Sequence, residues 1–356
     1  MNPLGAVSKE HAIRAAGPSA WQPPSRPAEL GLESSRAPVR PGGNERLAVA
    51  EPDGMVFVPG GSFRMGSDRH YPEEAPTSQA MVERFWIDRT PVTNAQFEAF
   101  VTATGYVTLA ERTPSREAYP DAPPELLRPA SLVFTPTLGP VSLRDPSAWW
   151  RLTFDANWRR PAGPEGPAAA PDHPAVHIAF EDAAAYAAWA GKALPSEAQW
   201  ECAARGGLEA ADYAWGDALA PNGRQMANIW LGEFPWRREA PHGFPATTPV
   251  GLFPANGYGL LDMIGNVWEL TADLYEPHRR PVGLPCCAPA ANPAEGRGDP
   301  RAHTAVPPSR VVKGGSHLCA PAYCQRYRPA ARQPQADDTS TSHVGFRCVR
   351  HSGSPR

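Results

Sequence analysis

Apolar residues alternate with polar or small ones in two segments that begin near residue 55. The first, MVFVPGGSFRMGS, alternates on both sides of a Pro-Gly-Gly sequence and predicts a β-hairpin that starts at Met55. After a polar loop, MVERFWID returns to a strand pattern with Phe85 and Ile87 on one face. We therefore expect β-structure at the start of the folded region.

The pattern then changes to the helical period. Thr93 and Gln96 match a capping box, in which each side chain bonds the backbone N–H of the other residue. The helix that follows carries an apolar stripe and ends at Gly105. The stripe comprises Phe97, Phe100 and Val101.

Two more helices are predicted further along the chain. One spans 181–190, with Tyr186 and Trp189 facing inward and a glycine at 191 as its stop. The other opens at a second capping box, Ser196 to Gln199, and ends at a Gly-Gly pair.

The remaining sequence predicts loops and short strands. Residues 106–170 are irregular and proline-rich, with Trp149, Trp150 and Trp158 as anchors of an ordered loop. From residue 207 to 350 short strands alternate with turns, beginning with YAWGD and ending with VGFRCVR. Helices in the first half and strands at both ends predict an α+β fold. We expect a single domain over 51–352, after a disordered Pro-, Ala-, Arg- and Ser-rich tail over 1–50.

Composition narrows the classes of partner. The 356 residues are 42% hydrophobic and 20% charged with a formal charge of −3, so we expect no nucleic-acid partner. No apolar run reaches membrane-spanning length and the N-terminus lacks the apolar core of a signal peptide, so we expect a monomer in the cytoplasm without a membrane partner.

The cysteines are the first candidates for chemistry. Cys319 and Cys324 are five residues apart, and three readings stay open: an inert or disulfide-linked pair, a structural zinc site completed by neighbouring side chains, or two thiolates for a soft ion such as Cu(I). Spacing alone does not decide among them. We expect Cys202 and Cys348 to be core residues, and the adjacent Cys286 and Cys287 to be ordinary loop thiols.

A second candidate lies in LDMIGNVWE. Asp262 and Glu269 flank the turn at Gly265 and Asn266, and two carboxylates with exposed backbone carbonyls suit Ca²⁺. A solvated turn beside a buried Trp268 explains the same residues equally well. No phosphate-binding glycine loop, Gly-x-Ser-x-Gly elbow or His-Glu-x-x-His helix is present in the sequence.

These segments resemble the formylglycine-generating enzyme family, also called the sulfatase-modifying factor family. The resemblance runs from residue 55 to residue 350 through FVPGGSFRMGS, WIDRTPVTNAQFEAFVTATGY, LPSEAQWECAARGG, NGYGLLDMIGNVWEL and GFRC. It implies a C-type-lectin-like α+β fold with little regular secondary structure. GGSHLCAPAYCQRYRPAAR resembles the family's active-site segment. It implies copper-dependent oxidation by O₂ of the cysteine in a sulfatase Cys-x-Pro-x-Arg motif to Cα-formylglycine.

The resemblance also implies roles for single residues. Cys319 and Cys324 match the catalytic pair that binds Cu(I), and Ser316 and Tyr323 match neighbouring active-site residues. Trp158 matches an aromatic residue of the substrate cleft. His343 replaces an asparagine of the vertebrate enzymes, and we expect it to contact substrate.

Two structural Ca²⁺ sites are implied in the same way. Asp262, Gly265, Val267 and Glu269 match the first site, and the second is matched by Asn228, Ile229 and Phe244. His242, however, stands where the family has an acidic ligand, which puts the second ion in doubt. Ala204 and Pro329 replace cysteines that are paired in vertebrate members, in agreement with a reducing cytoplasm.

Two other classes of function compete with the oxidase. A non-catalytic or ligand-binding member of the same lectin-like fold would bind no Cu(I) and would be indifferent to loss of the two cysteines. A non-haem iron sulfoxide synthase would need a three-histidine site and an additional helical domain, so it ranks last.

Overall fold

The computed structural model describes residues 54–117, 119–276 and 308–351. The predicted tail over 1–50 and the pair Cys286–Cys287 lie outside these ranges. The described residues fall within one compact unit, Ala50–Arg356. Its three α-helices are α1 (Asn94–Thr104), α2 (Phe180–Trp189) and α3 (Glu197–Arg205). The strands are β1 (Met55–Val58), β2 (Gly61–Met65), β3 (Ser78–Val82), β4 (Phe85–Asp88), β5 (Ala130–Phe134), β6 (Trp150–Phe154), β7 (Leu231–Glu233), β8 (Arg237–Glu239), β9 (Trp268–Leu274), β10 (Ser309–Lys313), β11 (Arg332–Ala336), β12 (Val344–Gly345) and β13 (Val349–His351).

The predicted hairpin near residue 55 is wrong, although both of its strands exist. β1 pairs with β4, and β2 pairs with β3, so the Pro-Gly-Gly sequence separates two sheets instead of joining one pair. Gly60 explains the divergence. It has a φ of +72°, and a Cβ there would lie 2.5 Å from the Val82 carbonyl oxygen. The backbone therefore crosses directly over the β3–β4 connection, which only glycine allows.

The helices follow their predicted signals. Both capping boxes form, with Thr93 at the start of α1 and Ser196 at the start of α3, and each of these helices ends at a left-handed glycine. One detail of α2 differs from the prediction. Trp189 is 45% exposed, although its ring contacts those of Phe100 and Tyr186 at tilted angles. No helix among the described residues is both long and apolar enough to cross a membrane.

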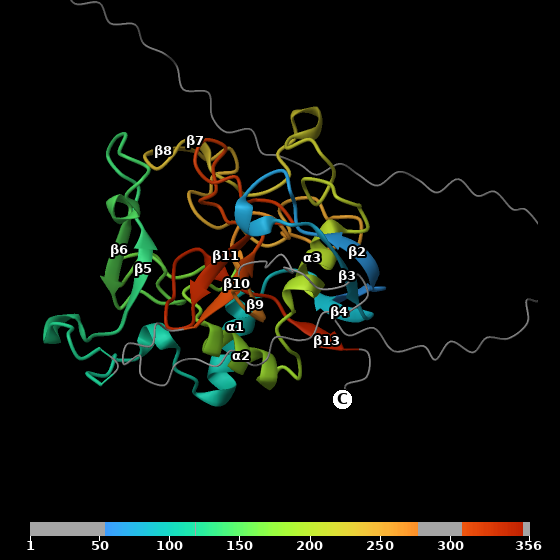
Figure 1. Ribbon diagram of the computed structural model, residues 1–356. Coiled ribbons are helices and arrows are strands. Elements are labelled where there is room, and N and C mark those ends of the chain that lie inside the picture. Colours follow the sequence, from blue (N-terminus) through green and yellow to red (C-terminus); the bar gives the residue numbers. More distant parts are fainter. Residues whose placement is uncertain (1–53, 118, 277–307, 352–356) are drawn as a thin grey trace, which may run out of the picture. The chain divides into compact units, whose positions relative to one another are not determined.

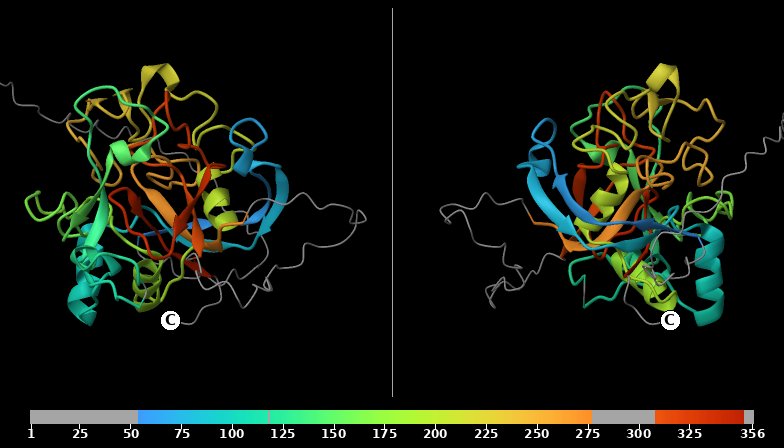
Figure 2. Two further views of the ribbon diagram at one scale, coloured as in Figure 1. Left: turned by 60° about the vertical axis from the view of Figure 1, so that its left-hand side comes forward. Right: turned by 90° about the vertical axis from the view of Figure 1, so that its right-hand side faces the viewer.

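A four-stranded sheet has the strand order β11–β10–β9–β12, and its first three strands lie side by side in Figure 1. β12 runs parallel to β9. A smaller sheet joins both ends of the described chain, because β4 pairs with β1 on one side and β13 on the other. Helix α3 packs against β9 and β10 and also against β2 and β3 (Figure 2). It therefore links the N-terminal strands to the sheet that leads into the cysteine segment.

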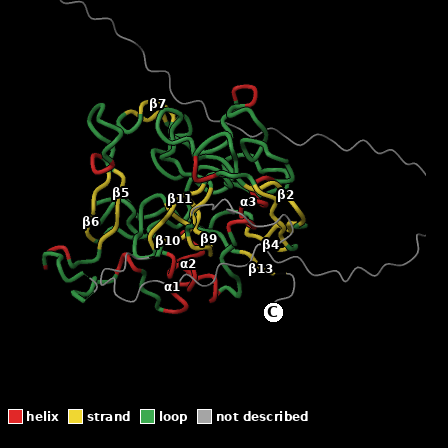
Figure 3. The backbone as a smooth tube through the Cα atoms, in the orientation of Figure 1, coloured by secondary structure: helices red, strands yellow, loops and turns green. Residues whose placement is uncertain are grey.

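Residues 106–170 contain a β-hairpin that the sequence pattern did not predict. β5 pairs with β6 in antiparallel register, with Leu132 opposite Leu152 and Phe134 opposite Trp150. Trp149 and Trp158 are buried as expected of loop anchors. Between residues 207 and 267, by contrast, turns replace most of the predicted strands, and YAWGD forms only an isolated bridge (Figure 3). These short elements confirm an α+β fold with little regular secondary structure.

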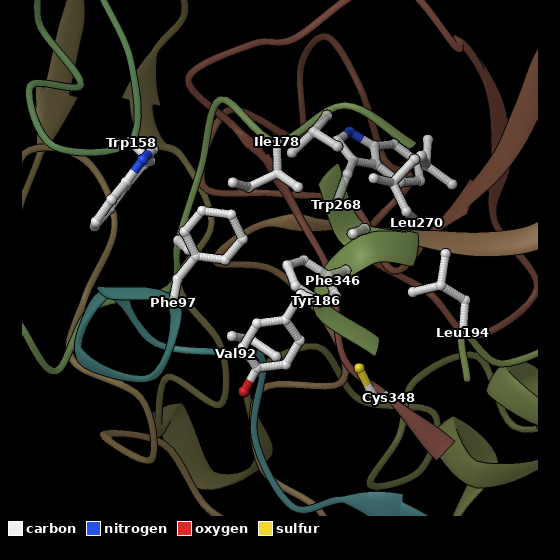
Figure 4. Packing of buried hydrophobic residues seen from close by; sticks show 14 of the residues in the cluster. Val92, Phe97, Trp158, Ile178, Tyr186, Leu194, Trp268, Leu270, Phe346 and Cys348 are labelled. Atoms are coloured by element: carbon white, nitrogen blue, oxygen red, sulfur yellow. The ribbon is translucent and has the colours of Figure 1, made fainter. Parts of the chain in front are cut away.

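Aromatic packing fills the main core (Figure 4). Phe97 of α1 contacts Trp158, Tyr186 and Phe346, each with ring centroids 5.2–6.3 Å apart. Cys348 belongs to the same cluster and is fully buried, and Cys202 lies in a second cluster. The prediction that both are core residues is confirmed.

Candidate active site

The cysteine segment begins with a turn that only glycine can form. Gly314 and Gly315 have φ angles of +90° and +72°. A Cβ on Gly314 would lie 2.8 Å from the Met263 carbonyl oxygen, and one on Gly315 would lie 2.7 Å from the Arg326 carbonyl oxygen. The chain leaving β10 is thus pressed against the backbone just beyond Cys324, which brings the two cysteine segments together.

Local hydrogen bonds then set the positions of the two sulfurs. The Ser316 carbonyl accepts from the Cys319 N–H at 2.9 Å, and the Ala320 carbonyl accepts from the Cys324 N–H at 2.9 Å. These consecutive turns place the Cys319 and Cys324 Sγ atoms 3.2 Å apart. Both residues are buried and both are free thiols. The two sulfurs are therefore in direct contact without a bond between them in this structure.

The two thiols differ in acidity. Burial, together with the neighbouring sulfur, raises the pKa of Cys319 well above its ordinary value. The hydrogen bond from Cys319 and the charge of Arg326 lower the pKa of Cys324. Cys324 is therefore the more acidic thiol of the pair, and Cys319 is the one that favours keeping its proton.

Arg326 is a site residue that sequence reasoning missed. Its Nη1 lies 3.9 Å from the Cys324 sulfur, and its Nε donates to Glu73 Oε1 at 2.9 Å. The guanidinium lies 3.8 Å from the centroid of the Tyr71 ring. Its position two residues after Cys324 was a signal, but Glu73 and Tyr71 are about 250 residues away and no local pattern marks them.

The sulfurs line a pocket of about 200 Å³. Its aromatic wall contains Tyr323, which stacks on Phe234 with ring centroids 4.5 Å apart, and Trp149, which meets Tyr323 edge-on. Ser316 also lines it, and the Ser316 hydroxyl accepts from the Leu318 N–H, which leaves its own hydrogen free to donate.

His343 lies on the rim of this pocket. Its ring is 4.8 Å from that of Trp150, and its Nδ1 pairs with the Thr341 hydroxyl at 2.7 Å. Burial lowers the pKa of His343 to about 3, so the imidazole is neutral at physiological pH. Trp158 is not part of the pocket lining; it is 3% exposed and packs on Phe97. Trp149, Trp150 and Trp268 are the tryptophans that line the pocket with the cysteines, and the sequence indicates the first two only as loop anchors.

The donor chemistry of the pair fits a soft monovalent metal. Two thiol sulfurs converge at the floor of a pocket, and thiolates select ions such as Cu(I). Within the described ranges, no three side chains of His, Cys, Asp or Glu gather around one point. A metal at this pair would thus be held by the protein through sulfur alone.

The residues predicted for the first Ca²⁺ differ from those of the second in that they include two buried carboxylates. Glu269 accepts from Arg347 and from the Trp200 indole, and Asp262 accepts from the Gly251 N–H at 2.6 Å. Arg347 pairs with the Glu269 carboxylate but contacts Asp262 only at its backbone carbonyl, so the Asp262 carboxylate has no cationic partner of its own in the ranges that the structure describes. The two carboxylates and the backbone carbonyl groups of Gly265 and Val267 are the hard oxygen ligands that Ca²⁺ prefers.

The residues predicted for the second Ca²⁺ do not fit. The Asn228 Oδ1 accepts from Arg238 Nη2 at 2.7 Å, so a cationic side chain already occupies the amide oxygen. His242 is exposed and meets the Phe253 ring edge-on, and Phe244 contacts His173. Ile229 is buried in the core. No carboxylate joins this group in the described part of the chain.

Comparisons with known proteins agree with the geometry. A formylglycine-generating enzyme of Mycobacterium tuberculosis is 54% identical over 300 residues, which cover 83% of this chain and 97% of that protein. One of Streptomyces coelicolor is 42% identical over 83% of this chain and 88% of its own length. An inactive Cα-formylglycine-generating enzyme 2 of mouse is 35% identical over 87% of this chain and 90% of its own length.

A solved structure, PvdO from Pseudomonas aeruginosa, aligns with a TM-score of 0.54 and 25% identity over 83% of this chain and 94% of its own. The family model described as a sulfatase-modifying factor enzyme 1-like domain matches residues 42–352. The match spans every described element and both cysteines of the pocket. This chain belongs to the family of sulfatase-modifying factor enzyme 1-like proteins.

Proposed function

We propose that this chain is a formylglycine-generating enzyme. It oxidises the cysteine of a Cys-x-Pro-x-Arg segment in a sulfatase polypeptide to Cα-formylglycine, with O₂ as the electron acceptor. The observation that carries the proposal is the buried Cys319–Cys324 pair, 3.2 Å apart at the floor of a pocket. It occurs in a chain 54% identical to an enzyme of that name.

The electron balance defines what else the reaction needs. Converting a cysteine side chain to a thioaldehyde releases two electrons, and water then replaces sulfur to give the aldehyde and H₂S. Reduction of O₂ to water consumes four electrons. The remaining two must come from an external reductant, for which two thiols that end as a disulfide suffice.

Cys319 and Cys324 would hold Cu(I) in this proposal. The bound metal would supply the one-electron chemistry that couples the substrate thiol to O₂. The protein's own contribution is to keep Cys324 as a thiolate, with Arg326 and the Cys319 thiol as its partners. Burial of both sulfurs excludes bulk oxidants from the pair.

The other pocket residues orient the reactants. The Ser316 hydroxyl has a hydrogen to donate toward the pocket, and the Tyr323 ring forms part of its wall. Burial raises the pKa of Tyr323, so its phenol stays protonated and also serves as a donor. Neutral His343 and the Trp150 ring give the rim an uncharged surface for the substrate backbone.

The pocket also determines the form of the substrate. A volume of about 200 Å³ admits a cysteine side chain and its neighbours but no folded element. We therefore propose an extended, unfolded sulfatase segment as partner, bound by a monomer in the reducing cytoplasm. One structural Ca²⁺ is proposed at Asp262, Gly265, Val267 and Glu269.

The test uses purified protein, a peptide with the Cys-x-Pro-x-Arg sequence, copper, air and a thiol reductant. Mass spectrometry should detect conversion of the cysteine to the aldehyde by the wild type and none by Cys319→Ser or Cys324→Ser. Cys202→Ala is the matched control, because Cys202 is a buried free thiol remote from the pocket lining. No conversion by the wild type would point to the non-catalytic reading of this fold, and full conversion by either active-site variant would remove the cysteine pair from the mechanism.

A further inference from the structure

The side chain of Arg238, half-buried with an inaccessible Nε, belongs to a closed ring of hydrogen bonds beside the active-site turn. Arg238 Nη2 donates to Asn228 Oδ1 at 2.7 Å, and Asn228 Nδ2 donates to Asn266 Oδ1 at 3.2 Å. The Asn266 carbonyl accepts from His317 Nδ1 at 2.8 Å and from the His317 N–H at 2.9 Å. Arg238 Nη1 closes the ring by donating to the His317 carbonyl at 3.0 Å.

The ring joins three segments that are distant in sequence. Arg238 lies on β8, Asn266 lies in the turn before β9, and His317 lies between Ser316 and the first cysteine of the pocket. Asn228, Asn266 and His317 are each less than 5% exposed. Displacing any member of the ring should therefore shift the backbone that positions Cys319.

The charge of Arg238 is not matched by an acid. No ion pair joins it to a carboxylate among the described residues, and its Nε has no hydrogen-bond partner. Burial lowers the pKa of Arg238 to about 10, so the side chain stays cationic at neutral pH. Its charge is met by an amide oxygen and a carbonyl oxygen, which are also typical ligands of a hard metal ion.

We propose that Arg238 replaces the second calcium ion: its guanidinium is the resident cation of the Asn228 site and holds the active-site turn in position. The Arg238 guanidinium and a calcium ion cannot bind the same oxygen atoms, because they would compete for these ligands and repel each other. Position 242, where an acidic calcium ligand is expected, carries a histidine. An acid is not needed there because Arg238 already supplies the positive charge.

Calcium stoichiometry tests the first half of this proposal independently of activity. Metal analysis after equilibrium dialysis should find no more than one bound Ca²⁺ in the wild type and in His242→Asp. The double variant R238N/H242D should bind one more, because it removes the resident cation and adds a carboxylate. A second calcium in the wild type, or no gain in the folded double variant, would overturn the replacement.

The positioning role rests on the proposed function and is tested by kinetics. Arg238→Met should lower kcat roughly tenfold to a hundredfold, the effect of displacing a reacting group by about 1 Å, with little change in KM. Arg237→Met is the matched control, because Arg237 is exposed on the same strand and contacts the neighbouring Glu233 and the Trp236 ring; its kcat should stay within about twofold.

Rescue separates positioning from a general structural effect. Added calcium should restore kcat in R238N/H242D and should have no such effect in Arg238→Met. A wild-type kcat in Arg238→Met would overturn the positioning role. If the wild type itself fails to convert the peptide, the proposed function fails, while the calcium count still decides what occupies the Asn228 site.

Discussion

At the scale of single residues, the two active-site thiols are made unequal by what surrounds each sulfur. The more deeply buried Cys319 sulfur meets the second sulfur and the Ser316 N–H, whereas Cys324 is next to the Arg326 cation. A shared proton between two sulfurs 3.2 Å apart follows from this asymmetry. The pair thus has one nucleophilic sulfur before any metal arrives.

Removing the cation near Cys324 should weaken its thiolate. In Arg326→Met, the pKa of Cys324 should rise from about 6. The rate of alkylation by iodoacetamide at neutral pH should fall, by about tenfold for each unit by which the raised pKa exceeds the assay pH. Peptide mapping of the alkylated protein measures it. Arg326→Lys is the control, because it keeps the charge; an unchanged alkylation rate in the methionine variant would contradict the assignment.

His177 makes stability depend on pH. It is fully buried at a φ of +59°, donates from Nε2 to the Pro161 carbonyl and pairs through Nδ1 with Ser131. Burial lowers its pKa from 6.5 to about 4, so the folded state favours the neutral ring. Its contribution is therefore complete above about pH 6.5 and is lost as the pH falls toward 4, by about 3 kcal/mol in total.

Urea unfolding of the wild type and of His177→Asn across this pH range measures that contribution. Asparagine tolerates a positive φ and does not titrate, so the difference in unfolding free energy between the two proteins isolates the histidine. We expect the unfolding free energy of the wild type to fall by about 3 kcal/mol relative to that of His177→Asn on acidification. A difference independent of pH would contradict the prediction.

At the scale of elements, the sequence correctly predicted helix starts, which depend on neighbouring residues. It did not correctly predict which strands pair, because that depends on distant segments. The capping boxes at Thr93 and Ser196 formed as predicted, because all their partners lie within four residues. The hairpin at residue 55 failed because strand patterns do not identify the partner strand, and β1 and β2 each pair with a different one.

The glycine turn before the cysteines is the element on which their spacing depends. Gly315→Ala would put a Cβ 2.7 Å from the Arg326 carbonyl oxygen and should displace the segment of Cys324. We expect a loss of about 1–3 kcal/mol of stability from overpacking, beyond the cost of the positive φ, and a large loss of peptide oxidation.

Gly259→Ala is the matched control for that variant. Gly259 also has a positive φ, of +87°, but a Cβ there meets nothing within 4 Å. The melting temperatures and the oxidation rates of the two variants are measured. Any difference between Gly315→Ala and Gly259→Ala should therefore come from the steric clash alone. Equal effects of the two substitutions would show that glycine is required at position 315 because of backbone strain and not because of contact with the second cysteine segment.

At the scale of the whole molecule, a buried charge network on α3 holds the sheets together. Glu201 accepts from the Gly66 N–H at the end of β2, from Arg205 on its own helix and from Lys313 at the end of β10. All three side chains of this network are less than 6% exposed. It therefore anchors the strand that enters the active-site turn.

Glu201→Gln should destabilise the fold by about 3–5 kcal/mol, because it leaves Arg205 and Lys313 buried with less compensating charge. Chemical denaturation measures this loss. Glu233→Gln, which breaks an exposed pair with Arg237, is the control and should change stability by less than about 1 kcal/mol. A similar small change in both variants would mean that the buried network is not a stabilising unit.

The candidate site was predicted only as far as its residues lie close together in sequence. The spacing of Cys319 and Cys324 identified a pair without deciding its chemistry, and the family resemblance supplied the role. Glu73, Tyr71 and Arg238 escaped prediction because their partners are brought to them by tertiary packing. The same limit explains Trp158, whose surroundings depend on Phe97 and not on its neighbours in the chain.

The hydrogen-bonded ring at Asn228 has an evolutionary consequence. A chain with both an arginine at position 238 and an acid at 242 would pair those two side chains, and a chain with neither would leave the Asn228 and His317 oxygens without a cation. Either intermediate disturbs the turn that carries Cys319. Positions 238 and 242 should therefore change together among relatives, so that each lineage keeps one source of positive charge there.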